Sequence, residues 1–492
     1  MHPIAFIRKN RRSAVTRGRR FCFIRERETM VHLFEKNGFH IVLDVHSGAV
    51  HDVDEVAYDV IALYEKKPKE QIKDEILKKY KDISGDDVDE IFRDIETLIE
   101  KGLLFSEDRF RSVANNIKKK DDVIKALCLH VAHSCNLACT YCFAGQGKYK
   151  GEQALMSFET GKKALDFLIA HSGTRRNLEV DFFGGEPLIN FGVVKDLTAY
   201  ARSQEKKYNK NFRFTLTTNG LLIDDDVIDF CNREMSNVVL SLDGRPEVND
   251  HFRKTINGKG SYDLILPKFK KLVEARGNKN YYIRGTYTKY NPDFFKDILH
   301  MVAEGFSEVS MEPVVCAPEE DYALGDEELP ILLEQYDALG KEMDHRRKEG
   351  KPFTFYHYML DLQGGPCIIK RISGCGVGSE YMAVTPKGDL YPCHQFVGDP
   401  RFCIGSVDRG ITNETLRRKF KSCNVYAHKE CDDCFARFFC SGGCVANAFH
   451  ATGHLDGVYE YGCKLHRRRI ENAIMLKVSE ARDRREEKEK EV

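Results

Sequence analysis

The sequence has no tryptophan, no net charge and no long run of apolar residues. Its 492 residues include 76 basic and 76 acidic side chains, and this balance indicates neither nucleic acid nor a membrane surface as a general partner. No apolar segment reaches the roughly 20 residues that a membrane-spanning helix requires. We draw no conclusion from the missing tryptophan. The length of the chain predicts roughly three domains.

Residues 1–29 are basic, but no apolar segment follows the charges as it would in a secretory or twin-arginine signal. We therefore expect a disordered extension upstream of a natural start at Met30. Without a secretory signal, the 17 cysteines are expected in a reducing cytoplasm, where they would bind metal rather than form disulfides.

A loop with three cysteines dominates the middle of the chain: Cys135, Cys139 and Cys142 have C-x3-C-x2-C spacing. A 4Fe–4S cube normally takes four thiolates, so three leave one iron open for a ligand that the protein does not supply. The alternative, a zinc site, usually has four ligands in two pairs. The loop resembles the cluster loop of radical S-adenosylmethionine (SAM) enzymes. In that family the amino and carboxylate groups of SAM chelate the open iron, and the resemblance places Tyr141 near the adenine.

From Ala126 onward, candidate strands alternate with helical stretches such as Ser157–His171 and Asp293–Glu304. Six strand–helix units predict an α/β fold, a partial (β/α)6 TIM-like barrel, with its site at the C-terminal strand ends. The six candidate strands are Ala126–Ala132, Leu178–Phe183, Phe212–Thr218, Asn237–Leu242, Tyr281–Thr288 and Glu308–Val315.

Motifs at these strand ends resemble the SAM-binding segments of the same family. Gly184, Gly185 and Glu186 begin a GGEP motif after the second strand; its glycines would let the backbone approach the ligand, and its glutamate would accept from the SAM ammonium. After the fourth strand, Ser241 and Asp243 are expected as ribose or backbone ligands.

Three further charged side chains have open roles. Arg253 is expected to pair with the SAM carboxylate, with a surface ion pair as the alternative. Arg284 and Glu312, on the fifth and sixth strands, face the cavity or form a core ion pair.

A second cysteine register follows a charged helical connector. Its spacing resembles the SPASM domain of peptide-modifying radical SAM enzymes, which implies two auxiliary 4Fe–4S clusters and, with the loop, three clusters in all. Zinc would suit Cys431 and Cys434 alone but not the whole set. The resemblance assigns a distal cluster to Cys431, Cys434, Cys440 and Cys463, and a proximal cluster to Cys375, Cys393 and Cys444.

Two closed cubes need eight thiolates, and this register supplies seven. Either Cys367 is the eighth ligand, or the proximal cluster keeps an open iron for a cysteine of the substrate. Six other cysteines lack such spacing and are expected as buried apolar fillers: Cys22, Cys128, Cys231, Cys316, Cys403 and Cys423.

Residues 31–105 are typical of a small independent domain, with a hairpin (Phe39–Val45 and Ala49–Val53) followed by three helices. This is a winged-helix pattern. The third helix is strongly acidic, which argues against DNA binding. Ahead of a radical SAM core, the domain resembles the peptide-recognition element of ribosomal-peptide maturases, in which a leader segment adds a strand to an exposed sheet edge. The alternative is a packing module.

The predicted organisation has seven parts. They are a disordered basic extension (1–29), a winged-helix leader-peptide recognition domain (30–105), a linker (106–125), the radical SAM partial barrel (126–320), a helical connector (321–360), the SPASM domain (361–475) and a charged tail (476–492).

The resemblance is closest to the maturases of cysteine-rich SCIFF precursor peptides, and rests also on the segments around Cys375 and Cys393. It implies an enzyme that uses a 5′-deoxyadenosyl radical to install thioether crosslinks from cysteine sulfur to α-carbons. Its partners would be a cysteine-rich precursor with a leader segment and an electron donor such as ferredoxin or flavodoxin. Two alternatives stay open: a maturase of the anaerobic sulfatase type, which oxidises a Ser or Cys side chain, and an iron–sulfur sensor that contacts DNA.

Overall fold

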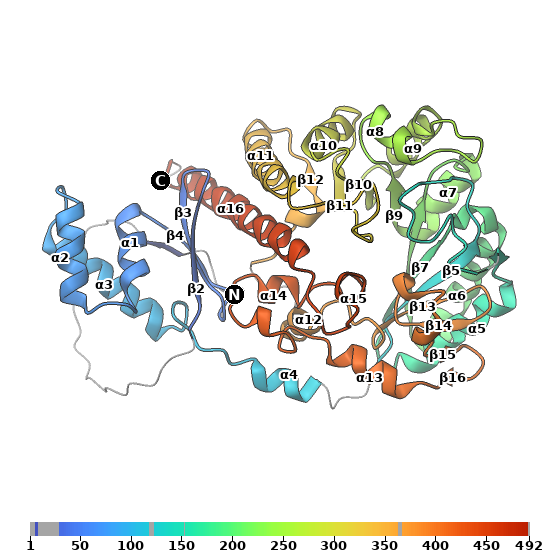
Figure 1. Cartoon of the computed structure of the whole chain (residues 1–492), viewed down its shortest axis with the longest axis horizontal. Helices are drawn as coiled ribbons and strands as arrows, with labels where there is room; N and C mark the ends of the chain where they lie inside the picture. The colour runs from blue at the N-terminus through green and yellow to red at the C-terminus, as the bar shows by residue number, and fades with distance from the viewer. Residues whose placement is uncertain (1–4, 8–28, 118–122, 152, 363–366, 491–492) are drawn as a thin grey trace.

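The computed structural model describes residues 5–7, 29–117, 123–151, 153–362 and 367–490. A small N-terminal module lies at one end of the molecule, and a large sheet covered by helices lies at the other (Figure 1). The C-terminal segments, drawn in orange and red, lie between the two (Figure 1).

The N-terminal module consists of a short antiparallel sheet followed by three helices. Its strands are β2 (Val31–Lys36), β3 (Phe39–Asp44) and β4 (Val50–Val53). The helices are α1 (Glu55–Leu63), α2 (Lys69–Lys79) and α3 (Gly85–Glu100). A capping box between Ser84 and Asp87 starts α3, since each side chain bonds to the backbone N–H of the other residue.

The module is not independent of the rest of the chain, contrary to the prediction. One face of its sheet packs on its own helices through Val42 and Val53. The opposite face, with Phe34 and Ile41, packs against Phe438 and the C-terminal helix. The sheet is therefore the middle layer of a shared core, which explains why β3 is a nearly continuous apolar run.

The N-terminal extension also differs in part from the prediction. Residues Ala5–Ile7 form β1, which pairs in parallel with the edge strand β4. The expectation of a disordered segment is wrong for these three residues. The remainder of the extension, including Cys22, lies outside the described residues, apart from Thr29, which bridges to Glu107.

The six predicted barrel strands are present, and all are parallel. They are β5 (Ala126–His133), β7 (Asn177–Gly184), β8 (Asn211–Thr218), β9 (Met235–Ser241), β10 (Tyr281–Tyr287) and β11 (Glu308–Pro313). The connecting helices include α5 (Phe158–His171), α6 (Phe191–Tyr208), α7 (Asp225–Glu234), α8 (Pro246–Phe252), α9 (Tyr262–Arg276) and α10 (Phe294–Ala303).

Alternation along the strands separates a helix-facing core from an inner face. In β7, Val180 and Phe182 are fully buried, while Asp181 and Phe183 between and after them stay partly accessible. The apolar set packs with the covering helices in one large core. The other set borders a cavity inside the barrel.

The sheet continues into the C-terminal domain. β13 (Tyr381–Val384) pairs in parallel with β5, and β14 (Asp389–Tyr391), β15 (Gly405–Ser406) and β16 (Gly410–Ile411) add antiparallel strands beyond it. At the other edge, β12 (Thr354–Phe355) pairs with β11. The barrel and the cysteine-rich domain therefore share one sheet.

The last helix, α16 (Glu460–Lys490), packs along α11 (Glu328–Lys348) and reaches the N-terminal sheet. The prediction of a charged tail at 476–492 is therefore wrong for its first part: Val478 is fully buried, and Arg482 pairs with the buried Asp52. The predicted linker likewise contains α4 (Arg111–Ile117). No described helix has the length and apolar character needed to cross a membrane.

Candidate active site and auxiliary cluster sites

The cysteine loop follows β5 and is fixed at its middle by a second segment. Leu137 forms a β-bridge with Thr255, and the Ala138 N–H donates to the Lys254 carbonyl at 2.7 Å. Burial raises the pKa of Cys135 to about 11 and that of Cys139 to about 12, with smaller contributions from the other cysteines of the loop. The loop therefore gathers its three thiols at one place, as a shared cluster requires.

Tyr141 and Arg253 meet at the buried carboxylate of Asp243. The Tyr141 hydroxyl donates to Asp243 at 2.6 Å, and the Arg253 guanidinium donates at 3.0 Å. The Thr286 N–H donates to the same carboxylate at 2.9 Å. Arg253 is thus not in a surface ion pair, and Asp243 positions two predicted SAM-binding side chains.

Glu186 ties the ends of β7 and β8 together. Its carboxylate accepts from the Thr218 hydroxyl at 2.9 Å, from the Asn219 N–H at 2.8 Å and from the Leu188 N–H at 3.1 Å. A carboxylate has about four acceptor positions, so one remains for a ligand ammonium. Burial raises the pKa of Glu186 to about 7.

Asn219 is a residue that the sequence did not single out. Its amide donates to Asn136 at 2.8 Å and to the Cys135 sulfur at 3.6 Å. Its place directly after a barrel strand was the available signal, because the ends of parallel strands meet at one edge.

The glycines of the GGEP motif allow β7 to approach the cysteine loop. Gly184 has φ +128°, and a Cβ there would lie 2.3 Å from the Ala132 carbonyl oxygen. A Cβ on Gly185 would lie 2.2 Å from the Ser134 carbonyl oxygen. Any side chain at these two positions would collide with the backbone of the segment that leads into the cysteine loop. Glycine is therefore needed here for the packing of the two segments, with or without a ligand. Ser241, the end of β9, pairs in register with Arg284.

A cavity of about 540 Å³ lies on the inner face of the barrel sheet and reaches the cysteine-rich domain. Asp181 on β7 borders it, and burial, with Glu179 nearby, raises the pKa of its carboxyl to about 7. Arg284 also borders the cavity. Glu312 instead pairs at 3.2 Å with the buried Arg469, while its own side chain is partly exposed. The cavity is lined on the C-terminal side by Tyr381 and His394.

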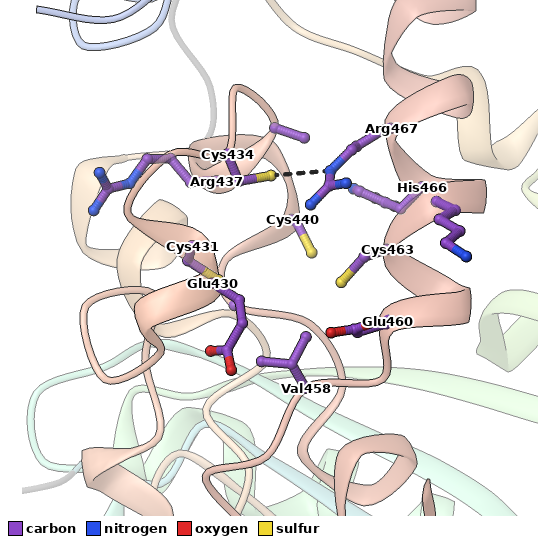
Figure 2. A pocket seen from close by; sticks show the side chains of 13 residues that line it. Glu430, Cys431, Cys434, Arg437, Cys440, Val458, Glu460, Cys463, His466 and Arg467 are labelled. Carbon is purple, nitrogen blue, oxygen red and sulfur yellow. Dashed lines mark hydrogen bonds between the residues drawn. The ribbon is translucent and has the colours of Figure 1, made fainter.

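The four distal cysteines line a second cavity, of about 220 Å³ (Figure 2). They come from a short helical turn (Lys429–Cys431), α14 (Arg437–Cys440) and α16, and from the loop between the first two. Burial raises the pKa of Cys431 to about 11 and that of Cys440 to about 12. Figure 2 shows the Arg467 side chain from α16 reaching the Cys434 sulfur, to which its Nε donates at 3.5 Å.

All four cysteines that the resemblance assigns to the distal cluster line this one cavity. A closed cube takes four thiolates, so the donor set fits such a cluster. The zinc alternative concerned Cys431 and Cys434 alone, and the fold places Cys440 and Cys463 in the same cavity.

The proximal cysteines also come together. Burial raises the pKa of Cys393, and Cys444 and Cys375 add to the shift. Cys367 is exposed at the start of α12 (Ile368–Ser373). Arg371, on the same helix, is one of its charged neighbours.

The expected filler cysteines differ from one another. Cys231 is fully buried in the barrel core, as predicted. Cys128 is also buried, but it borders the barrel cavity. The structure gives Cys316, Cys403 and Cys423 an intermediate exposure.

Comparison with known proteins supports the iron–sulfur interpretation. Residues 129–302 match the Radical SAM superfamily, and residues 375–435 match SPASM, an iron–sulfur cluster-binding domain. The chain carries a radical SAM domain followed by a SPASM domain. The first match contains the three loop cysteines, and the second contains Cys375, Cys393, Cys431 and Cys434 but ends before the other three register cysteines. SAM and 4Fe–4S clusters therefore fit the donor groups that the fold brings together.

Several curated proteins are similar over much of the chain. The radical SAM cyclopropyl synthase TigE of Paramaledivibacter caminithermalis is 20% identical over 477 residues, which cover 89% of this chain and 93% of TigE. The serine-type anaerobic sulfatase-maturating enzyme of Bacteroides thetaiotaomicron is 28% identical over 372 residues, 67% of this chain and 84% of that enzyme. These similarities relate the radical SAM and SPASM domains of this chain to those of sulfatase-maturating enzymes and of TigE.

Solved structures show the same fold. His-tagged anSMEcpe with bound AdoMet aligns with a TM-score of 0.62 at 20% identity, covering 73% of this chain and 96% of that one. Streptococcus suis SuiB bound to S-adenosylmethionine aligns with a TM-score of 0.50 at 16% identity, covering 87% and 97%. The alignment with SuiB extends over more of this chain than that with anSMEcpe.

Proposed function

We propose that this enzyme installs thioether crosslinks between cysteine sulfur and α-carbons in a cysteine-rich, SCIFF-type precursor peptide. One observation carries the proposal. The proximal site gathers three cysteines, and His394, next to the ligand Cys393, borders the barrel cavity. A substrate cysteine in that cavity would be the fourth thiolate of a cube that otherwise lacks one.

A second candidate is oxidation of a Ser or Cys side chain in a target protein. It is favoured by the 28% identity with the serine-type sulfatase-maturating enzyme. That alignment covers 67% of this chain, so it leaves a large part of the chain without a counterpart. In the thioether proposal, the N-terminal module binds the leader of the precursor by strand addition.

When bound, SAM and the reduced loop cluster supply the hydrogen-abstracting radical, and the auxiliary clusters supply an electron acceptor. An external donor such as ferredoxin or flavodoxin provides the initial electron. The protein contributes position. Tyr141 and Arg253, held by Asp243, and the remaining acceptor position of Glu186 orient SAM at the loop. The cavity walls orient the peptide and exclude water from it.

Asp181 is the proton acceptor in this proposal. Forming one thioether removes a hydrogen atom from an α-carbon, and one proton and one electron from the thiol. The Asp181 carboxyl borders the cavity and accepts from Thr215. Its charged or titratable neighbours include Glu179, Cys128, Tyr282 and Tyr381, and Arg213 and Arg284 line the same cavity. Burial outweighs these charges, so the pKa of Asp181 is raised.

The function test uses a synthetic cysteine-rich precursor deuterated at its α-carbons. The wild-type enzyme, reduced anaerobically with SAM, is expected to move deuterium into 5′-deoxyadenosine and to remove one deuterium and one thiol hydrogen from the peptide per crosslink, both measured by mass spectrometry. A formylglycine product on a sulfatase-type peptide, without crosslinks in the precursor, would instead support the second candidate.

The Asp181 role predicts a pH dependence. A carboxyl with a pKa raised to about 7 accepts a proton only when it is ionised, so the thioether formed per 5′-deoxyadenosine should rise as pH increases through about 7. Asp181→Asn should lose this inflection and lower the ratio at least about tenfold, the usual minimum for a positioned base being about 100-fold. Glu308→Gln, a carboxyl change on another wall of the cavity, should keep the wild-type profile.

Cys367 gives a direct test of the open iron. If a substrate thiolate completes the proximal site, Cys367→Ala should keep full iron content, about twelve irons per chain, and still form thioethers. Loss of about four irons together with loss of crosslinking would show that Cys367 is a permanent ligand. Iron analysis and EPR with a cysteine-containing precursor and its Cys→Ser analogue separate the two outcomes.

A further inference from the structure

Arg467 is a cation without a carboxylate partner beside the distal cysteines. Its Nε donates to the Cys434 sulfur at 3.5 Å, and its other charged neighbours are Cys463 and Cys431. No described carboxylate lies within ion-pair distance of it, although Glu430 and Glu460 also line the cavity. Cys463 and Arg467 lie one helical turn apart on α16, so the same helix face carries a ligand and this charge.

The other cations of the cavity are different. Arg437 faces Asp108 and Asp432, each at 3.9 Å. Lys464 lines the cavity, but it is exposed to solvent, where its charge is screened. Among the described cations that line this cavity, Arg467 is the one that donates a hydrogen bond to a cysteine sulfur.

A cation and an N–H donor at a ligand sulfur act on the potential of a cluster. Reduction adds one negative charge to a cube and its four thiolates. A fixed positive charge stabilises that reduced form more than the oxidised form, and a hydrogen bond to sulfur acts in the same direction. Both effects raise the reduction potential.

We propose that Arg467 raises the reduction potential of the distal cluster, which makes that cluster the electron sink of the auxiliary pair. The electron released when substrate is oxidised then moves away from the barrel cavity. Arg467 is a positioning residue, since it acts through the cluster and touches no substrate. The inference rests on the SPASM domain rather than on the identity of the product.

The test is an EPR-monitored redox titration of anaerobically reconstituted, full-length Arg467→Gln. Its distal midpoint potential should become more negative by about 59 mV, which corresponds to a tenfold change in a one-electron equilibrium. The loop and proximal clusters should keep their wild-type potentials and serve as internal standards. Lys464→Gln removes a charge from the same cavity without removing a sulfur contact, so its distal potential should stay at the wild-type value.

The opposite results overturn the proposal. These are a wild-type distal potential in fully loaded Arg467→Gln, or an equal shift in Lys464→Gln. If Arg467→Gln loses the distal irons, Arg467→Met is titrated instead, because it also removes the charge and the donor while keeping an unbranched side chain. A loaded cluster with a negative shift of about 59 mV supports the proposal, whereas an unchanged potential rejects it. A failure of the thioether assay leaves these potentials unaffected.

Discussion

Replacing Cys135, Cys139 and Cys142 together by alanine is expected to remove one cube and abolish SAM cleavage. These three thiols are the proposed ligands on the loop after β5, and three is the number of thiolates that a cube with one open iron takes. Iron should fall from about twelve to about eight per chain. Production of 5′-deoxyadenosine under a strong reductant, measured chromatographically, should fall to background.

Cys316→Ala is the matched control, because this cysteine lies outside both registers and is half-buried. It should retain full iron and wild-type SAM cleavage. If the triple variant still makes 5′-deoxyadenosine while Cys316→Ala behaves normally, the assignment of the loop as the SAM site is wrong. The auxiliary clusters of the triple variant should remain, because their seven ligands come from other segments.

Local sequence patterns predicted the barrel and the cysteine sites well. Each of the six strands begins and ends within two residues of its predicted bounds, because a buried parallel strand is a short, apolar run with turns at both ends. The cysteine spacings likewise predicted that Cys431, Cys434, Cys440 and Cys463 lie together, and they line one cavity; that they bind a cluster stays a prediction. Ligands on one loop are constrained by the cluster itself, so their chemistry can be read without the fold.

The contacts between distant segments were not predictable in this way. The pairing of β13 with β5 joins residues more than 250 positions apart, and a four-residue strand leaves no periodic signal of its partner. The contacts of Asp243 were not predictable either. Its carboxylate accepts hydrogen bonds from Tyr141 and Arg253, whereas the sequence predicted that it would bind the ligand. Asp181 was missed because the sequence of a strand shows that alternate residues share a face, but not which face borders the cavity.

The N-terminal module shows the consequence of such a missed contact. Its helices were predicted correctly, but an amphipathic pattern reports only that one face is buried. The second buried face of the sheet was visible only as the apolar run in β3, whose Ile41, Val42 and Leu43 are all fully buried. His32 on β2 stacks on Phe435 with ring centroids 3.6 Å apart, directly beside the distal ligand Cys434. The module therefore covers the distal cluster loop.

Two truncations are expected to have opposite effects because of this contact. Deleting residues 1–105 removes the sheet that covers Phe438, Ile470, Ile474 and Cys431. Exposing several such side chains costs on the order of 10 kcal/mol at about 1.5–3 kcal/mol each, which is comparable to the stability of a whole domain. We expect loss of the distal cluster, a drop of about four irons, and loss of peptide modification.

Deleting residues 1–28 removes β1 alone and leaves the shared core in place. This variant should keep all its iron. Since Ala5–Ile7 occupy the β4 edge, where a leader strand would pair in parallel or antiparallel fashion, its affinity for a precursor leader should be equal to or higher than that of the full chain. Iron analysis and fluorescence anisotropy with a labelled leader peptide check both variants. Full iron after deletion of residues 1–105 would show that the module does not support the distal site. Weaker leader binding after deletion of residues 1–28 would show that the leader does not dock at the β4 edge.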